Sequence, residues 1–152
     1  QLDRFLMRIR IGYPDPASER EIVRRGGQMP ALEIRPVLTA EEVVEIQSWV
    51  PQVRVDESLV DYMLAIVEKT RTHESFSLGV SPRGAQALYR ATQALAMLEG
   101  RDYAIPDDVK RLVIPVFAHR VVLNPRVMVA HRAADLSDRI LQELLTLVEV
   151  PL

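Results

Sequence analysis

Two arginines stand where a guanidinium could bind phosphate. Arg83 is the second helical residue after Ser81-Pro82, a pair in which Ser caps a helix and Pro takes its first position. A cation on the first turn lies near the positive end of the helix dipole, so a neighbouring acid or a bound phosphate has to offset the repulsion. Arg4 lies just before residues 6–11, an expected strand. From the residue types alone, an ordinary salt bridge is the favoured interpretation for both arginines.

The sequence lacks the motifs of several other reaction classes. A phosphate-binding loop needs Gly-Lys followed by Ser or Thr, and neither Lys69 nor Lys110 follows a glycine. An apolar run ending in Asp-Glu, which would hold Mg²⁺, is also absent, so the chain alone is not expected to hydrolyse a nucleotide. The three histidines are too far apart to indicate a metal site. Asp107 and Asp108 are adjacent on an expected helix, where first-turn acids that complement the dipole are the better interpretation.

The elements that would position these residues begin with a strand, a helix and a connector. Apolar residues alternate with arginines over 6–11, which is the period of a half-buried strand. Ser18 and Glu21 have the spacing of a capping box, which predicts a short helix ending at about Arg25. Residues 28–36 form a connector and are the best candidate for a domain boundary.

The rest of the chain is predicted to be mainly helical. Capping residues and amphipathic stripes indicate four long helices and a fifth near the C-terminal end. Residues 73–80 are expected to be a loop, Pro115 to kink or end the fourth helix, and residues 121–123 to form a short strand. The helices are expected to start near Thr39, Asp56, Ser81, Pro106 and Leu136.

Composition bounds the function further. The 152 residues are 48% apolar and carry 19 basic and 21 acidic side chains, so there is no basic excess for general nucleic-acid binding. The absence of cysteine excludes disulfides and thiolate chemistry and fits a reducing compartment. No apolar run reaches the length of about 18 residues that a transmembrane helix needs. The chain begins at Gln1 without Met and reads as a piece of a longer protein.

Five segments are distinctive enough to compare with known families. They are residues 1–5 (QLDRF), 8–14 (RIRIGYP), 79–84 (GVSPRG), 100–109 (GRDYAIPDDV) and 118–121 (AHRV). In this order they resemble the C-terminal part of the MoxR-family AAA+ ATPases, from the end of the large nucleotide-binding subdomain into the helical lid. The resemblance ends at about residue 123.

The resemblance implies a mainly α fold, a helical-bundle AAA+ lid domain that follows a short strand and helix of the α/β ATPase subdomain. Residues 1–36 would be the remnant of the large subdomain with its linker, and residues 37–152 would be the lid. The phosphate-binding loop and the Mg²⁺-binding acids of the family would precede Gln1.

The resemblance also assigns roles to the two arginines. Arg83 matches the sensor-2 arginine, which contacts the γ-phosphate of ATP. Arg4 resembles the arginine finger, which reaches the nucleotide of a neighbouring subunit in a ring. Both roles suit a planar cation, because it stabilises charge on the transferring phosphoryl group. ATP and Mg²⁺ are therefore expected cofactors of the full-length ATPase, while the fragment alone is expected to bind no cofactor and to be inactive.

By the same resemblance, the full-length protein would couple ATP hydrolysis to chaperone-like remodelling or assembly of other proteins. Its partners would be neighbouring subunits of a homo-oligomeric ring, expected to be hexameric, and von Willebrand factor A-type proteins. The fragment is expected to be mainly monomeric, because most ring-building surfaces would be missing. We expect a cytoplasmic protein without bound nucleic acid or membrane insertion.

Two other functions compete with this interpretation. A self-contained helical interaction module without a nucleotide role would show the same amphipathic pattern. A helix-turn-helix DNA binder is disfavoured, because the helix after Ser81 carries Arg90 but no basic face. The position of Arg83 on a first turn favours the ATPase lid over both.

Overall fold

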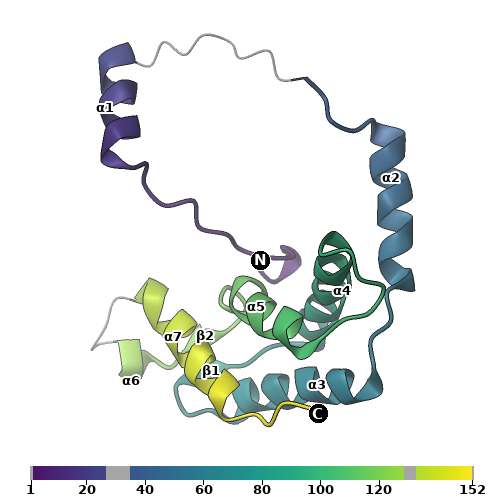
Figure 1. The fold of residues 1–152 in the computed structure, drawn as a ribbon. Helices are drawn as coiled ribbons and strands as arrows, with labels where there is room; N and C mark the ends of the chain where they lie inside the picture. Colours follow the sequence, from purple (N-terminus) through teal and green to yellow (C-terminus); the bar gives the residue numbers. More distant parts are fainter. Residues whose placement is uncertain (1, 27–34, 129–132, 152) are drawn as a thin grey trace.

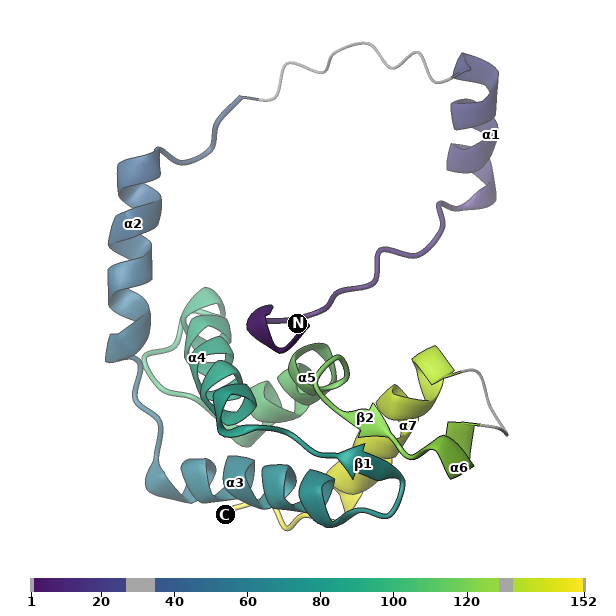
Figure 2. The same cartoon turned by 180° about the vertical axis from the view of Figure 1, so that it is seen from behind.

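The computed structural model describes residues 2–26, 35–128 and 133–151. Four helices pack around one aliphatic core, and a pair of short strands lies beside them (Figure 1, Figure 2). The mainly α fold expected from the sequence is confirmed. The four core helices are α3 (Glu57–Thr72), α4 (Pro82–Leu98), α5 (Pro106–Phe117) and α7 (Ala133–Thr146).

The core helices begin where the sequence supplies caps. Asp56 accepts the Ser58 N–H at 2.9 Å ahead of α3, and hydrogen bonds from the hydroxyl and N–H of Ser58 lower the pKa of this carboxyl. Ser81 accepts the Gly84 N–H at 3.2 Å ahead of α4. Pro106 occupies the first position of α5. These three starts agree with the sequence prediction.

The core consists of the aliphatic faces of these helices, where burial of apolar area supplies most of the stabilisation. Each of α3, α5 and α7 buries an aliphatic face, and Val148, just after α7, is buried with them. The buried aliphatic residues include Leu59, Met63, Ile66, Val67, Val109, Leu112, Val113, Val116, Leu136, Ile140, Leu141, Leu144 and Val148.

The two strands were only partly predictable. β1 (Phe76–Leu78) pairs antiparallel with β2 (Val122–Leu123), and the short strand predicted over 121–123 is confirmed. The prediction of a loop over 73–80 is wrong for β1. Three residues are too few to show an alternating pattern, and the pairing partner lies more than forty residues further along the chain. A four-residue helix, α6 (Pro125–Met128), follows β2.

The strand predicted over 6–11 is wrong. After a 3₁₀ turn, η1 (Leu2–Arg4), residues 7–15 form neither helix nor strand. Ile9 and Ile11 are 72% and 93% exposed, so the alternating pattern meets no core within the described residues. A strand also needs a neighbour with free backbone groups, and here the segment is held by individual contacts with α5 and α7 instead.

The helix that follows starts earlier than predicted. α1 (Pro16–Arg25) is capped by Asp15, whose carboxylate accepts the N–H groups of Ala17 and Ser18, so the predicted start at Ser18 is wrong. Hydrogen bonds from Ser18 and Ala17 lower the pKa of Asp15. The predicted end is confirmed, because Gly26 adopts the left-handed conformation that closes many helices.

α2 (Ala40–Trp49) has the predicted capping box, in which Thr39 and Glu42 exchange hydrogen bonds between side chain and backbone. A 3₁₀ turn, η2 (Val50–Gln52), follows it. Neither α1 nor α2 contains a buried residue, and both stand away from the core helices (Figure 1, Figure 2). Most of the predicted connector, residues 27–34, lies outside the described residues.

α5 differs from the prediction in two details. The helix continues through Pro115 and ends two residues later, at Phe117. Asp107 is the exposed first-turn acid expected from the sequence, but Asp108 is buried and bonded to Arg101. Asp108 is thus the predicted first-turn acid, and in addition it belongs to a buried ion pair that the sequence did not indicate.

Candidate functional site

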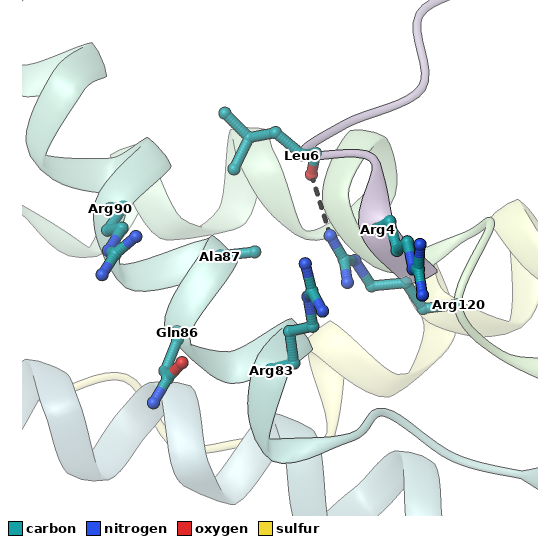
Figure 3. A pocket seen from close by; sticks show the side chains of 7 residues that line it. All are labelled: Arg4, Leu6, Arg83, Gln86, Ala87, Arg90 and Arg120. Carbon is teal, nitrogen blue, oxygen red and sulfur yellow. Dashed lines mark hydrogen bonds between the residues drawn. The ribbon is translucent and has the colours of Figure 1, made fainter. Parts of the chain in front are cut away.

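Four arginines from three parts of the chain surround one open pocket of about 490 Å³ (Figure 3). One comes from the N-terminal turn, two from α4 and one from the segment after α5. None of the described residues that line the pocket is acidic, so its walls are strongly positive. The lining residues are Arg4, Leu6, Arg83, Gln86, Ala87, Arg90 and Arg120.

Arg83 projects from the first turn of α4 into this pocket (Figure 3). The turn is rigid, because Pro82 fixes the backbone and Ser81 caps it by accepting the Gly84 N–H. The Arg83 side chain is exposed and has neither an ion pair nor a hydrogen bond within the described part of the chain. The salt bridge that the residues alone favoured is therefore not found for Arg83.

The start of α4 is anchored on the end of α3. The Thr70 hydroxyl, fully buried, accepts the Val80 N–H at 3.0 Å and donates to the Val67 carbonyl at 2.6 Å. Arg71 donates from Nε to the Val80 carbonyl at 2.9 Å. A Cβ on Gly79 would lie 2.7 Å from backbone atoms of α3, so only glycine allows this close approach. These contacts fix the position of the first turn of α4, from which the Arg83 side chain enters the pocket.

Arg4 ends the η1 turn and reaches the same pocket from the other side of the Arg120 side chain (Figure 3). Its side chain is exposed and, like that of Arg83, has no ionic partner among residues 2–26, 35–128 and 133–151. The structure thus brings together the two arginines that the sequence singled out. Neither forms the predicted salt bridge.

Arg120 was missed as a site residue, although it lies in the AHRV motif at residues 118–121. Its side chain is only 2% exposed and is bonded to backbone and carboxylate oxygens of the N-terminal turn. Its place in this motif was the available signal, but its partners are more than a hundred residues away and could not be read from the sequence.

Arg90 is the other arginine that sequence reasoning did not place in the site. It is exposed, lies about two helical turns after Arg83 on α4, and lines the same pocket. Positions seven apart fall on one helix face, so this spacing was a usable signal.

The pocket fits the phosphates of a nucleotide better than it fits a metal ion. Guanidinium groups match phosphoryl oxygens through paired N–H donors, and the donors of Arg4 and Arg83 are not used by any residue that the structure describes. Mg²⁺ prefers carboxylate and other oxygen ligands, and the described lining residues include no acid. Across the described residues there is also no group of three His, Asp or Glu side chains arranged to hold a metal.

No helix in the described part of the chain is both long enough and apolar enough to cross a membrane.

The helical bundle corresponds to a known domain class. Residues 68–144, about half of the chain, match the family model of the AAA lid domain. The chain belongs to this family.

The relatives confirm the resemblance to MoxR proteins. The chain is 40% identical to the uncharacterized protein YeaC of Bacillus subtilis over 99% of its own length and 47% of that protein. It is 36% identical to the chaperone MoxR1 of Mycobacterium tuberculosis over 82% of its length and 35% of that protein. The chain therefore spans about half, or less, of these relatives.

A solved structure has the same fold over almost the whole chain. It belongs to a Cytophaga hutchinsonii protein assigned as an ATPase, which superposes with a TM-score of 0.86 at 28% sequence identity. The match covers 99% of this chain and 48% of that protein. The lid-type fold of the chain is thus that of AAA+ ATPases.

Proposed function

We propose that this chain is the lid end of a MoxR-like AAA+ ATPase and that its arginine pocket acts on the phosphates of ATP. One observation carries the proposal: Arg4 and Arg83, far apart in the sequence, line one pocket without an ionic partner among the described residues. Unpaired guanidinium groups at close quarters repel one another, and a polyanion relieves that repulsion. ATP supplies the phosphoryl group whose transfer to water drives the cycle.

The proposed roles follow from where each side chain is held. Arg83, on the rigid first turn of α4, is the sensor-2 residue that contacts the γ-phosphate. Arg4, on the η1 turn, is the arginine finger. Because the two side chains line one pocket, we infer that both act on the same nucleotide.

The remaining parts of the proposal concern the whole protein. Residues 1–36 would complete the large subdomain and residues 37–152 would form the lid, with the phosphate-binding loop and Mg²⁺ ligands outside this chain. The subunits would form a ring, expected to be hexameric, that remodels or assembles other proteins, including von Willebrand factor A-type partners. The name of the chaperone MoxR1 supports the chaperone-like part of this proposal.

The test is Arg83→Ala in the full-length protein, with ATP turnover and unfolding measured on the same preparation. A cation that contacts developing phosphoryl charge contributes on the order of 10²–10³ in rate. Arg83 has no described partner to lose, so its replacement is expected to change the free energy of unfolding by less than about 0.5 kcal/mol.

Arg111→Ala is the matched control. Arg111 lies on α5 in an exposed pair with Glu99, so its loss is expected to change stability slightly and turnover not at all. Normal turnover in an assembled Arg83→Ala ring would contradict the sensor role and favour an interaction module without nucleotide chemistry.

A further inference from the structure

We propose that Arg120 is a positioning residue that holds Arg4 at a fixed place beside Arg83. This inference rests on the proposed function, because it concerns how the two phosphate-contacting arginines are kept together. Arg120 lines the pocket, but its positive charge is already paired within the chain segment around Arg4.

The Arg120 guanidinium donates most of its hydrogen bonds to the chain segment around Arg4. Nη1 donates to the carbonyl and the carboxylate of Asp3, at 2.6 and 2.7 Å. Nη2 donates to the carbonyls of Phe5 and Leu6, the second at 3.3 Å and marked in Figure 3. Residues on both sides of Arg4 are thereby fixed.

The remaining N–H of the guanidinium is also used. Nε donates to the Val116 carbonyl at 2.8 Å, so the group makes five hydrogen bonds, as many as it has N–H donors. A buried guanidinium with every donor occupied has none left for a phosphate. Arg120 is therefore distinct from Arg4 and Arg83, whose guanidinium groups form no hydrogen bond or ion pair with the residues that the structure describes.

The end of α5 offers the N-terminal segment further contacts. The last carbonyls of a helix have no partner within it, and here the Pro115 carbonyl accepts the Arg8 N–H at 2.8 Å. The His119 Nε2 lies 3.1 Å from the Phe5 carbonyl. Residues 3–8 are thus held by one helix end as well as by Arg120.

Asp3 extends the same network to the helix that carries Arg83. Its carboxylate accepts from the Ser81 hydroxyl, at 3.3 and 3.4 Å, as well as from Arg120. Ser81 is the cap of α4. The turn that carries Arg4 is therefore tied to the start of α4 through Ser81 and to the end of α5 through Arg120. Arg4 and Arg83 should therefore keep a fixed position relative to one another.

The first test is Arg120→Met in the full-length protein, alone and combined with Arg4→Ala. If Arg120 acts through Arg4, Arg120→Met lowers ATP turnover at least tenfold but lowers it no further when Arg4 is already Ala. The KM for ATP should change less than kcat. Arg120→Lys should restore little, because an ammonium has three donors and cannot reproduce the fork of five. Arg111→Met, an exposed arginine on α5, is the matched control and should leave turnover unchanged.

The second test needs no nucleotide. Hydrogen exchange of the Arg8 N–H, measured on the same full-length variants, should be at least tenfold faster in Arg120→Met and unchanged in Arg111→Met. If Arg120→Met does not fold, His119→Ala removes one contact to Phe5 and should give a smaller change in the same two measurements.

The outcomes separate the two proposals. Normal turnover in Arg4→Ala would overturn the proposed function and, with it, the purpose of the positioning. Reduced turnover in Arg4→Ala together with a further, multiplying loss from Arg120→Met would overturn the positioning role alone. Unchanged exchange of the Arg8 N–H in a folded Arg120→Met protein would overturn it as well.

Discussion

Arg101 and Asp108 form a two-point ion pair at the start of α5. Nη1 and Nη2 of Arg101 donate to the two carboxylate oxygens at 2.8 and 2.7 Å. The Asp108 side chain is 2% exposed and that of Arg101 22% exposed. The same carboxylate accepts the Ile105 N–H at 3.0 Å, so it also closes the first turn of the helix.

Asp108→Asn should destabilise the chain by about 3 kcal/mol. The substitution removes the charge partner of Arg101 and leaves part of the buried hydrogen bonding between the two side chains unmade. Urea unfolding measures the change. Asp107→Asn is the control: this exposed acid forms a surface pair with Lys110, and its loss should cost less than about 0.5 kcal/mol. Equal effects of the two variants would contradict the structural role of the pair.

The pair also sets a pH dependence. Burial raises the pKa of Asp108, but the hydrogen bonds from Arg101 and the Ile105 N–H outweigh it and hold the pKa below its ordinary value. A depressed folded-state pKa stabilises the fold above the unfolded-state pKa, about 3.9, and this contribution is lost as the pH falls through the lower value. The stability difference between the wild type and Asp108→Asn should therefore stay constant from pH 7 to 5 and shrink below about pH 4.

Thr70→Val should cost about 1–3 kcal/mol, because the Val80 N–H then lies buried without a hydrogen-bond acceptor. Thr72→Val is the matched control two residues on. The Thr72 hydroxyl donates to the Glu68 carbonyl and is exposed, so its loss should change the unfolding free energy by less than about 0.5 kcal/mol. Chemical denaturation of both variants checks the difference, and similar costs would count against the Thr70 bridge.

Gly84→Ala should destabilise the chain by about 1–2 kcal/mol, although alanine is the better helix former. The added methyl carbon would lie 2.5 Å from Val80 Cγ1 and 3.2 Å from Arg120 Cδ. Val80→Ala removes the nearer atom, so the double variant should be less destabilised than the sum of the single ones. Strict additivity in thermal unfolding would mean that the close approach is not the cause.

Rings mixed from Arg4→Ala and Arg83→Ala subunits should not regain ATP turnover. If one pocket presents both arginines to one nucleotide, every interface in such a ring lacks one of them. Rings that mix Arg4→Ala with wild-type subunits are the positive control and should recover partly, because intact pockets remain. Recovery in the doubly mutant mixture, measured as turnover against mixing ratio, would show that the two arginines serve different nucleotides.

The helix starts were predictable because caps are local. A capping residue accepts a backbone N–H that lies no more than three residues further along the chain. Three such residues were predicted, and all three cap helices in the structure: Thr39, Asp56 and Ser81. Even the misplaced start of α1 is a local matter, since Asp15 stands three residues before the predicted cap, Ser18.

The failures concern contacts between distant parts of the chain. Residues 6–11 have a strand-like pattern, but they contact residues near 115 and 138. Those residues offer one backbone hydrogen bond and two ion pairs, and they do not offer the edge of a sheet. The pocket was predictable only in part for the same reason. Arg4 and Arg83 were singled out by motif, while Arg120 has partners that no spacing rule indicates.

The contact between Asp3 and Arg120 closes a loop of more than a hundred residues. Closing a loop of this length costs conformational entropy that short-range contacts do not, so it should form late in folding, after the helices have packed. A ribosome making this chain would expose the Arg4 turn several seconds before the residue that holds it, at about 5–20 residues per second. Until residue 120 emerges, the turn lacks the Arg120 contacts that fix it, so the arginine pocket cannot be completed before then.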